Sequence, residues 1–360
     1  MTIHIPSGAK LIKRVPRSPD APYACIDADH VPTDTPAIVA FGGELTRTPR
    51  DANSYANLLQ RLAEENKILN GIDFYSVVYD FGSRTPGLER AEQFRIAGRR
   101  VVNDIHPLLQ QERNDAIRAM NRNEPTANYV VQLYNILLRP RIVSEYDMKT
   151  NIFQTVEKLH RIMFYAHCHG ASTIWQMGRY MHADMIQMGF APRDIRRIQQ
   201  ELLVIQHSPI APLDNQYFTT LSFASAEDTM MQNHNNMFAR WMDENSSDVI
   251  PAYFAHGNLF VAGHLNEMSF QEHDHSGILY SADTSWPLTH DGRVIFTAER
   301  NALVHGMKNM IAGAPDLPSV AKLVNGDIVD FNQLQENGER LYKIMLGDLR
   351  RQNSRRDHQK

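Results

Sequence analysis

The sequence predicts an α/β fold, a three-layer α/β/α arrangement around a mainly parallel central sheet. Two observations predict it. Short apolar runs that are typical of buried strands alternate along the chain with longer segments of helical periodicity. The chain also has 360 residues, of which 42% are hydrophobic and 22% charged, enough for a sizeable core. Strands that alternate with helices favour parallel pairing, with the helices on both faces of the sheet.

The expected strands are short apolar runs that end at glycine, proline or small polar residues. They cover 36–41, 72–79, 162–166, 201–207, 217–224 and 257–263. The expected helices cover 51–67, 88–121, 151–159, 171–188, 193–200 and 299–311, with Asp51 as the candidate N-cap of the first. The apolar run 129–138 fits a strand by its Tyr, Val and Ile and a helix by its Gln and Asn, so both readings stay open.

One α/β domain is expected over 36–311, with a helical insertion around 88–160 and a lid over 229–257. Residues 1–35, rich in Pro, Asp and Thr, are expected to form an irregular N-terminal arm with a short strand around 10–15. Residues 312–360 form a C-terminal extension that ends in a basic tail.

Charge and cysteine content narrow the classes of function. The formal net charge of -4 is small for this length, so no global field favours nucleic acid as a partner. The chain has 2 cysteines, Cys25 and Cys168, which fits a reducing, cytoplasmic compartment better than a disulfide-stabilised fold. The N-terminus lacks the apolar stretch of a classical signal peptide, and no run of about 18 apolar residues predicts a membrane span. Non-classical export leaves no signature that the sequence would show.

The segment Ala166-His-Cys-His-Gly170 joins a predicted strand directly to a predicted helix. A small residue, a central nucleophile and a glycine at this spacing are typical of the sharp turn called a nucleophile elbow. Such a turn exposes the central side chain above the sheet. The following helix N-terminus also favours the thiolate form of a cysteine placed there. Cys168 is therefore the candidate nucleophile.

This motif resembles the Gly-x-Ser-x-Gly motif of the α/β-hydrolase superfamily, over roughly residues 36–311. Ala166 and Cys168 replace the usual first glycine and the serine. A cysteine in this position resembles dienelactone hydrolases and polyhydroxyalkanoate synthases. The resemblance implies a cysteine-dependent hydrolase or acyltransferase that acts on an ester, thioester or amide, with a small-molecule or acyl substrate and no cofactor.

The resemblance also implies an acid after a late strand and a histidine after the last one. Asp228 follows the strand 217–224 and is the candidate acid, with Glu227 as its neighbouring substitute. His275 precedes a short apolar stretch and is the preferred base. His264, which directly follows the last strand, is the alternative base, and His273 and His290 are further candidates.

The oxyanion that forms during acyl transfer needs backbone N–H donors. One is expected from His169, the residue after the nucleophile. The other is expected from the loop after the first strong strand, where Gly42 and Gly43 allow close approach to a substrate. His167, on the other side of Cys168, is placed with these substrate-binding residues.

Other functions remain open from the sequence. Cys168 could be an ordinary buried thiol in a non-catalytic protein of the same fold that binds a ligand or a partner. A metal-dependent hydrolase could use the cluster His256, His264, Glu267, His273, Asp274 and His275, although its spacing matches no established metal motif. No metal is assigned to the Cys168 site, and the sequence does not predict an oligomeric state.

Overall fold

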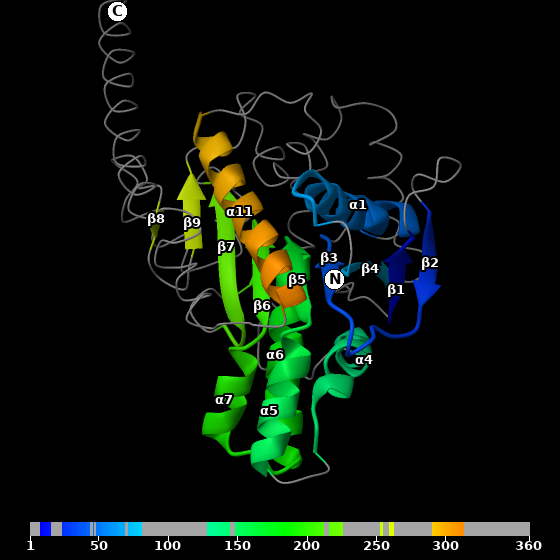
Figure 1. Ribbon diagram of the computed structural model, residues 1–360, viewed down its shortest axis with the longest axis vertical. Coiled ribbons are helices and arrows are strands. Elements are labelled where there is room, and N and C mark those ends of the chain that lie inside the picture. The colour runs from blue at the N-terminus through cyan, green and yellow to red at the C-terminus, as the bar shows by residue number, and fades with distance from the viewer. Residues whose placement is uncertain are drawn as a thin grey trace, which may run out of the picture.

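The computed structural model describes residues 8–15, 24–43, 46, 48–68, 71–80, 128–144, 148–211, 216–225, 253–254, 259–262 and 290–312. Its centre is a 9-stranded sheet with the strand order β2-β1-β4-β3-β5-β6-β7-β9-β8 (Figure 1). The strands are β1 (Gly8–Arg14), β2 (Cys25–Ala28), β3 (Ala37–Phe41), β4 (Asp73–Asp80), β5 (Ile162–His167), β6 (Leu203–His207), β7 (Thr219–Ser225), β8 (Tyr253–Phe254) and β9 (Leu259–Ala262).

The sheet is mixed but mostly parallel. Neighbouring strands from β4 through β3, β5, β6 and β7 to β9 run parallel, whereas β1, β2 and β8 pair antiparallel at the two edges. The prediction of an α/β fold with a mainly parallel sheet is confirmed at this level. The register aligns Phe41 of β3 with Ala166 of β5, and His167 with His207 of β6. The carboxyl ends of these three strands therefore meet at one edge of the sheet.

Helices lie against both faces of the sheet. They are α1 (Pro49–Glu65), α4 (Asn128–Leu137), α5 (Met148–Leu159), α6 (His169–Gln187), α7 (Pro192–Gln199) and α11 (His290–Ala312), with a short 3-10 helix, η1 (Arg139–Arg141), after α4. Successive residues of a strand point to opposite faces. In β5, Met163 and Tyr165 share a core with α1 and α11, whereas Phe164 and Ala166 share a second core with α4, α6 and α7. Figure 1 shows α1 and α11 together on one side of the sheet.

The structure corrects the expectation of an irregular arm over residues 1–35. Gly8–Arg14 forms a full strand, as expected around 10–15, but Cys25–Ala28 adds a second strand that pairs with it. None of the four residues of β2 is buried, and edge pairing rather than an apolar face defines it. The ambiguous run 129–138 is helical, since α4 buries Tyr129, Val130, Leu133, Tyr134 and Leu137 on one face.

Several sequence expectations fall outside the described residues. These are the helix over 88–121, the extension over 313–360 and the proposed lid over 229–257, except that Tyr253–Phe254 is strand β8. The first helix begins two residues before its predicted start. Thr48 is its N-cap, and Asp51 is the third helical residue, whose carboxylate accepts the backbone N–H of Thr48 in a capping box.

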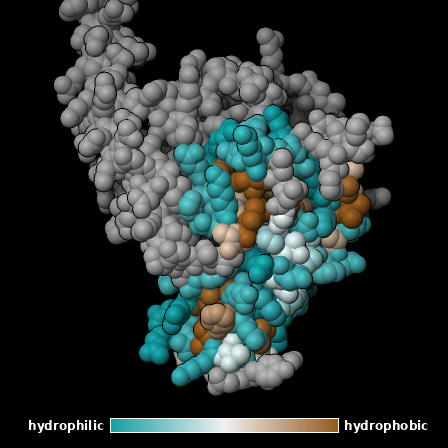
Figure 2. All heavy atoms as spheres, in the orientation of Figure 1, coloured by the Kyte–Doolittle hydropathy of each residue, from teal (hydrophilic) through white to brown (hydrophobic). Residues whose placement is uncertain are grey.

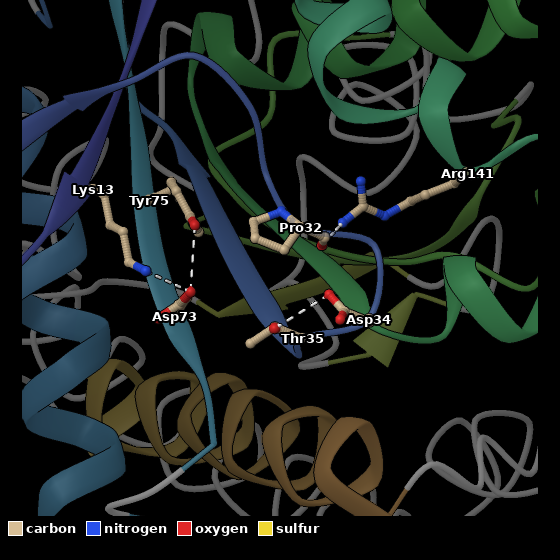
Figure 3. Close-up of polar contacts among 7 residues, drawn as sticks. All are labelled: Lys13, Pro32, Asp34, Thr35, Asp73, Tyr75 and Arg141. Atoms are coloured by element: carbon tan, nitrogen blue, oxygen red, sulfur yellow. Dashed lines mark hydrogen bonds and ion pairs between the residues drawn. The ribbon is translucent and has the colours of Figure 1, made fainter.

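Polar side chains fix β1 to its neighbours. Arg14 is buried, and its guanidinium donates to the side-chain oxygens of Asn53, Asn57 and Gln60 on α1. On the other face, Lys13 forms an ion pair with Asp73 of β4 at 2.7 Å, and the Tyr75 hydroxyl donates to the same carboxylate (Figure 3). These contacts hold the antiparallel edge strand in register with the parallel part of the sheet.

Arg141 is a fully buried cation held by backbone carbonyls. Its guanidinium donates to the carbonyl oxygens of Leu137, at the end of α4, and of Val31, in the segment before β3. It also donates to the carbonyl oxygen of Pro32 in that segment (Figure 3). Burial lowers the pKa of Arg141 to about 10, which leaves it charged at neutral pH. A cation at the C-terminus of a helix is favourable, so Arg141 joins α4 to the start of β3.

Hydrophilic residues cover much of the described surface on the face shown in Figure 2. The large apolar side chains that are exposed in the described part of the chain lie on separate elements. They are Ile26 on β2, Phe153 on α5, Ile186 on α6 and Ile311 on α11. No helix among the described residues is long and apolar enough to cross a membrane.

We expect Arg141→Met to lower the free energy of unfolding by about 3 kcal/mol, because two buried carbonyl oxygens and one part-buried carbonyl oxygen lose their donor. Arg139→Met is the matched control. Arg139 lies in the same 3-10 helix, but its side chain is 40% exposed in an ion pair with Asp184, so its loss costs less than about 1 kcal/mol. Urea unfolding measures both variants. Equal losses would show that Arg141 has no special role in joining α4 to the segment before β3.

Candidate functional site

Cys168 occupies the turn between β5 and α6 in an unusual backbone conformation. It is the N-cap of α6, with φ 53° and ψ −120°. Positive φ is uncommon in residues other than glycine, and strained backbone is concentrated at functional sites. Neighbouring strands hold this conformation. The Cys168 N–H donates to the carbonyl of His207 at 3.2 Å, and the Cys168 carbonyl accepts the N–H groups of Ala171 and Ile210.

Gly170 lets α6 start directly against β3. A Cβ on Gly170 would collide with the carbonyl oxygen of Phe41 and would lie 2.7 Å from its carbonyl carbon and 2.8 Å from its Cβ. Only glycine fits at this distance. Ala166 and Ala171, the small residues on either side, have no exposed surface. The small residues that the sequence motif required are thus where the strand and the helix approach most closely.

The loop after β3 lies against the thiol. A Cβ placed on Gly43 would lie 3.2 Å from the Cβ of Cys168, 3.6 Å from its Sγ and 3.5 Å from Nδ1 of His167. The backbone of Gly43 therefore borders the cysteine. Gly42 has a different neighbourhood, since its Cβ would meet the Thr46 side chain and the ring of Tyr55. Cys168 itself is only 2% exposed.

Tyr55 of α1 connects this loop to the histidine before the cysteine. Its hydroxyl lies 2.9 Å from Nδ1 of His167 and accepts the N–H of Gly43 at 3.4 Å. Burial raises the pKa of Tyr55 far above its ordinary value, and the hydrogen bonds from Gly43 and Thr46 only partly offset that rise. Tyr55 is therefore a neutral phenol at physiological pH.

His169, on the other side of Cys168, lies on the opposite face of the sheet. Its Nε2 is 3.4 Å from the hydroxyl of Tyr129 on α4, and its ring packs edge-on against Tyr79 of β4 at 5.6 Å between centroids. Each histidine that flanks the cysteine thus has a buried tyrosine within hydrogen-bonding distance. The backbone N–H of His169 belongs to the first turn of α6, where helix N–H groups lack intrahelical acceptors.

A buried His–Glu pair lies next to this network. Nδ1 of His207, at the end of β6, is 3.0 Å from the carboxylate of Glu299 on α11, and both side chains are at most 2% exposed. The rings of His207 and His167 are 5.9 Å apart. Burial raises the pKa of Glu299, while His207 and the hydroxyl of Tyr165 lower it in part. The pair fixes α11 against the carboxyl ends of the central strands.

The structure brings Cys168, His167, His169, Gly42 and Gly43 together at one edge of the sheet. The predicted acid Asp228 and the predicted bases His275 and His264 lie outside the described residues. The same holds for the alternative metal cluster between His256 and His275. Within the described ranges, no group of three or more His, Cys, Asp and Glu side chains could hold a metal ion.

The sequence pattern did not predict that Tyr55, His207 and Glu299 would be parts of this site. Tyr55 fitted the apolar stripe of its helix, and only its hydroxyl reaches the loop and His167. His207 did carry a signal, since it ends a buried strand adjacent to β5 at the edge where Cys168 lies. Glu299 carried none, because its partner is 92 residues away along the chain.

No protein-family model matches the chain, and none of the curated proteins compared with it matches.

We expect Gly170→Ala to cost about 2–3 kcal/mol of folding free energy, because the added methyl collides with the backbone of Phe41. Gly8→Ala is the control, since its Cβ would meet only the Gln132 side chain at 3.7 Å. Chemical denaturation checks both variants. A Gly170→Ala protein as stable as Gly8→Ala would contradict the close approach of α6 to β3.

Glu299→Gln should change how stability depends on pH. Because burial raises the pKa of Glu299, the folded protein holds this proton more tightly than the unfolded chain. The stabilisation that this tighter proton binding gives the folded state is complete below the ordinary glutamate pKa of 4.5. It is lost as the pH rises through the pKa of Glu299 in the folded state. Glutamine stays neutral. As the pH rises in that window, the free energy of unfolding of the variant should therefore increase relative to that of the wild type, by about 1.4 kcal/mol per pH unit.

Urea unfolding between about pH 4.5 and pH 8 measures this difference. Glu65→Gln is the control, because Glu65 lies at the surface in an ion pair with Arg300, the residue after Glu299. A difference between Glu299→Gln and the wild type that stays constant with pH would contradict the raised pKa.

Proposed function

We propose that the protein is a cysteine-dependent hydrolase or acyltransferase that acts on an ester, thioester or amide. The observation that carries the proposal is the strained conformation of Cys168 at the start of α6, at the carboxyl end of a central parallel strand. A cysteine that served only as core filler would gain nothing from a positive φ. The start of a helix next to the sulfur favours the thiolate, the form that attacks a carbonyl carbon.

The arrangement around the turn supports a hydrolase-like, three-layer architecture as part of the proposal. In α/β-hydrolases the nucleophile lies on a strand-to-helix turn, and the oxyanion N–H groups come from the residue after it and from an earlier strand-to-helix loop. Here His169 follows Cys168, and Gly43 lies in the loop between β3 and α1, against the thiol. The two cores on opposite faces of the sheet fit the same architecture.

In the proposed reaction the Cys168 sulfur attacks the substrate carbonyl, and backbone N–H groups of His169 and of the loop near Gly43 stabilise the oxyanion. A base takes the thiol proton and returns it to the leaving alcohol, thiol or amine, which departs as a thioester forms on Cys168. Water or another acceptor then releases the acyl group and restores the thiol. Each hydrolysis cycle consumes one water molecule and releases one acid together with one alcohol, thiol or amine.

We assign the base to His275, with His264 as the alternative, and the orienting acid to Asp228. Strand order supports Asp228 and the alternative base His264, and the short apolar stretch after His275 favours that residue. Asp228 follows β7 closely and His264 follows β9 closely, and both strands run parallel to β5. The carboxyl ends of parallel strands lie at the same edge of a sheet, so the chain leaves β7 and β9 on the side where Cys168 lies.

The proposal predicts that Cys168 is alkylated by iodoacetamide and acylated by p-nitrophenyl acetate at about pH 7, well below the ordinary thiol pKa. Cys25, a half-buried thiol on β2, is the internal reference. Cys168→Ala should abolish the acyl adduct and the release of nitrophenol, and Cys25→Ala should change neither. Mass spectrometry of tryptic peptides locates the adducts. If Cys168 reacts no faster than Cys25, the chain is a non-catalytic protein and the proposal is wrong.

A further inference from the structure

We infer that Tyr55 is a positioning residue of the Cys168 site, which sets the protonation of His167 and the position of the Gly43 loop. The inference rests on the proposed function and deepens it. Its first support is geometric, because one buried hydroxyl contacts both the N–H of Gly43, at 3.4 Å, and Nδ1 of His167, at 2.9 Å. Both partners border Cys168.

The hydrogen-bond donors around Tyr55 determine which atom accepts its hydroxyl proton. The N–H of Gly43 donates to the Tyr55 oxygen, and Nδ1 of His167 lies 2.9 Å from the same oxygen. Tyr55 is neutral, so its one proton can be donated to Nδ1, whereas a protonated Nδ1 would compete with Gly43 as a second donor to the phenol oxygen. The phenol therefore donates to Nδ1. His167 is then the neutral tautomer with its proton on Nε2.

Neutral His167 has a consequence for the thiol. A Cβ on Gly43 would lie 3.5 Å from Nδ1 of His167 and 3.6 Å from Sγ of Cys168, so these two atoms are at most about 7 Å apart. A positive charge on His167 at that range would favour the thiolate without any base. By keeping His167 neutral, Tyr55 leaves activation of the thiol to the proposed base, and its bond to Gly43 keeps the loop after β3 beside the sulfur.

The groups that face His167 come from each element packed against it. Tyr55 lies on α1, Tyr165 on β5, Cys168 at the start of α6 and His207 on β6, with Glu299 of α11 behind His207. Tyr165 provides the matched control. It is also a fully buried tyrosine of this face, with its ring centroid 6.5 Å from that of Tyr55, but its hydroxyl faces Glu299 rather than His167.

The test compares Tyr55→Phe with Tyr165→Phe in the full-length protein. Tyr55→Phe frees Nδ1 of His167 to take a proton. The rate at which iodoacetamide alkylates Cys168 at pH 6, divided by the rate in the same protein at pH 9, should therefore be about three- to tenfold higher than in the wild type. With p-nitrophenyl acetate, kcat should fall about tenfold with little change in KM, because the loop that carries Gly43 is misplaced for the oxyanion. Tyr165→Phe should leave the alkylation profile unchanged.

A second pair of variants separates a positioning role from a structural one. If Tyr55 acts on the thiol through His167, then adding Tyr55→Phe to His167→Gln should not change the pH profile of alkylation further. An unchanged profile and kcat in Tyr55→Phe would overturn the inference, as would an equal shift in both backgrounds. Absence of acylation in the wild type, with the Tyr55→Phe shift intact, would instead overturn the proposed function alone.

Discussion

The contact between Gly170 and the backbone of Phe41 is the constraint on which the rest of the site depends. It lets α6 begin with only Cys168 between it and the end of β5, so the chain must reverse its direction within that single residue. That reversal requires the positive φ of Cys168, and hydrogen bonds from its amide and carbonyl to the segment 207–210 hold it. The same contact draws the loop after β3, and with it Gly43, against the cysteine.

Two buried polar groups then fix the site from opposite faces of the sheet. Tyr55 holds His167 on the face covered by α1 and α11, and Tyr129 contacts His169 on the face covered by α4 and α6. Satisfied polar networks in a core specify one arrangement of side chains, because each alternative leaves a polar atom without a partner. The residues on either side of Cys168 are thus held by different helices.

The sequence allowed the central part of the fold to be predicted, because it depends on local patterns. The buried strands β3, β5 and β6 are continuous apolar runs, and the turn at Cys168 follows from a few adjacent residues between Ala166 and Ala171. β2 could not be predicted, because none of its residues is buried and only pairing with β1 makes them a strand. Tyr55 and the His207–Glu299 pair were not predictable either, because their contacts join residues 112 and 92 positions apart.

The position of α11 late in the sequence affects how the chain can fold during its synthesis. Met163, Ile205 and Leu221, on three successive strands, share a core with Leu303 and Met307 of α11. Until those later residues leave the ribosome, α1 alone is available to cover that face among the described helices. Domains generally fold as units, and transiently exposed apolar surface makes incomplete chains prone to aggregate. A nascent chain that stalls before α11 would therefore leave apolar surface exposed on the face where Tyr55 contacts His167.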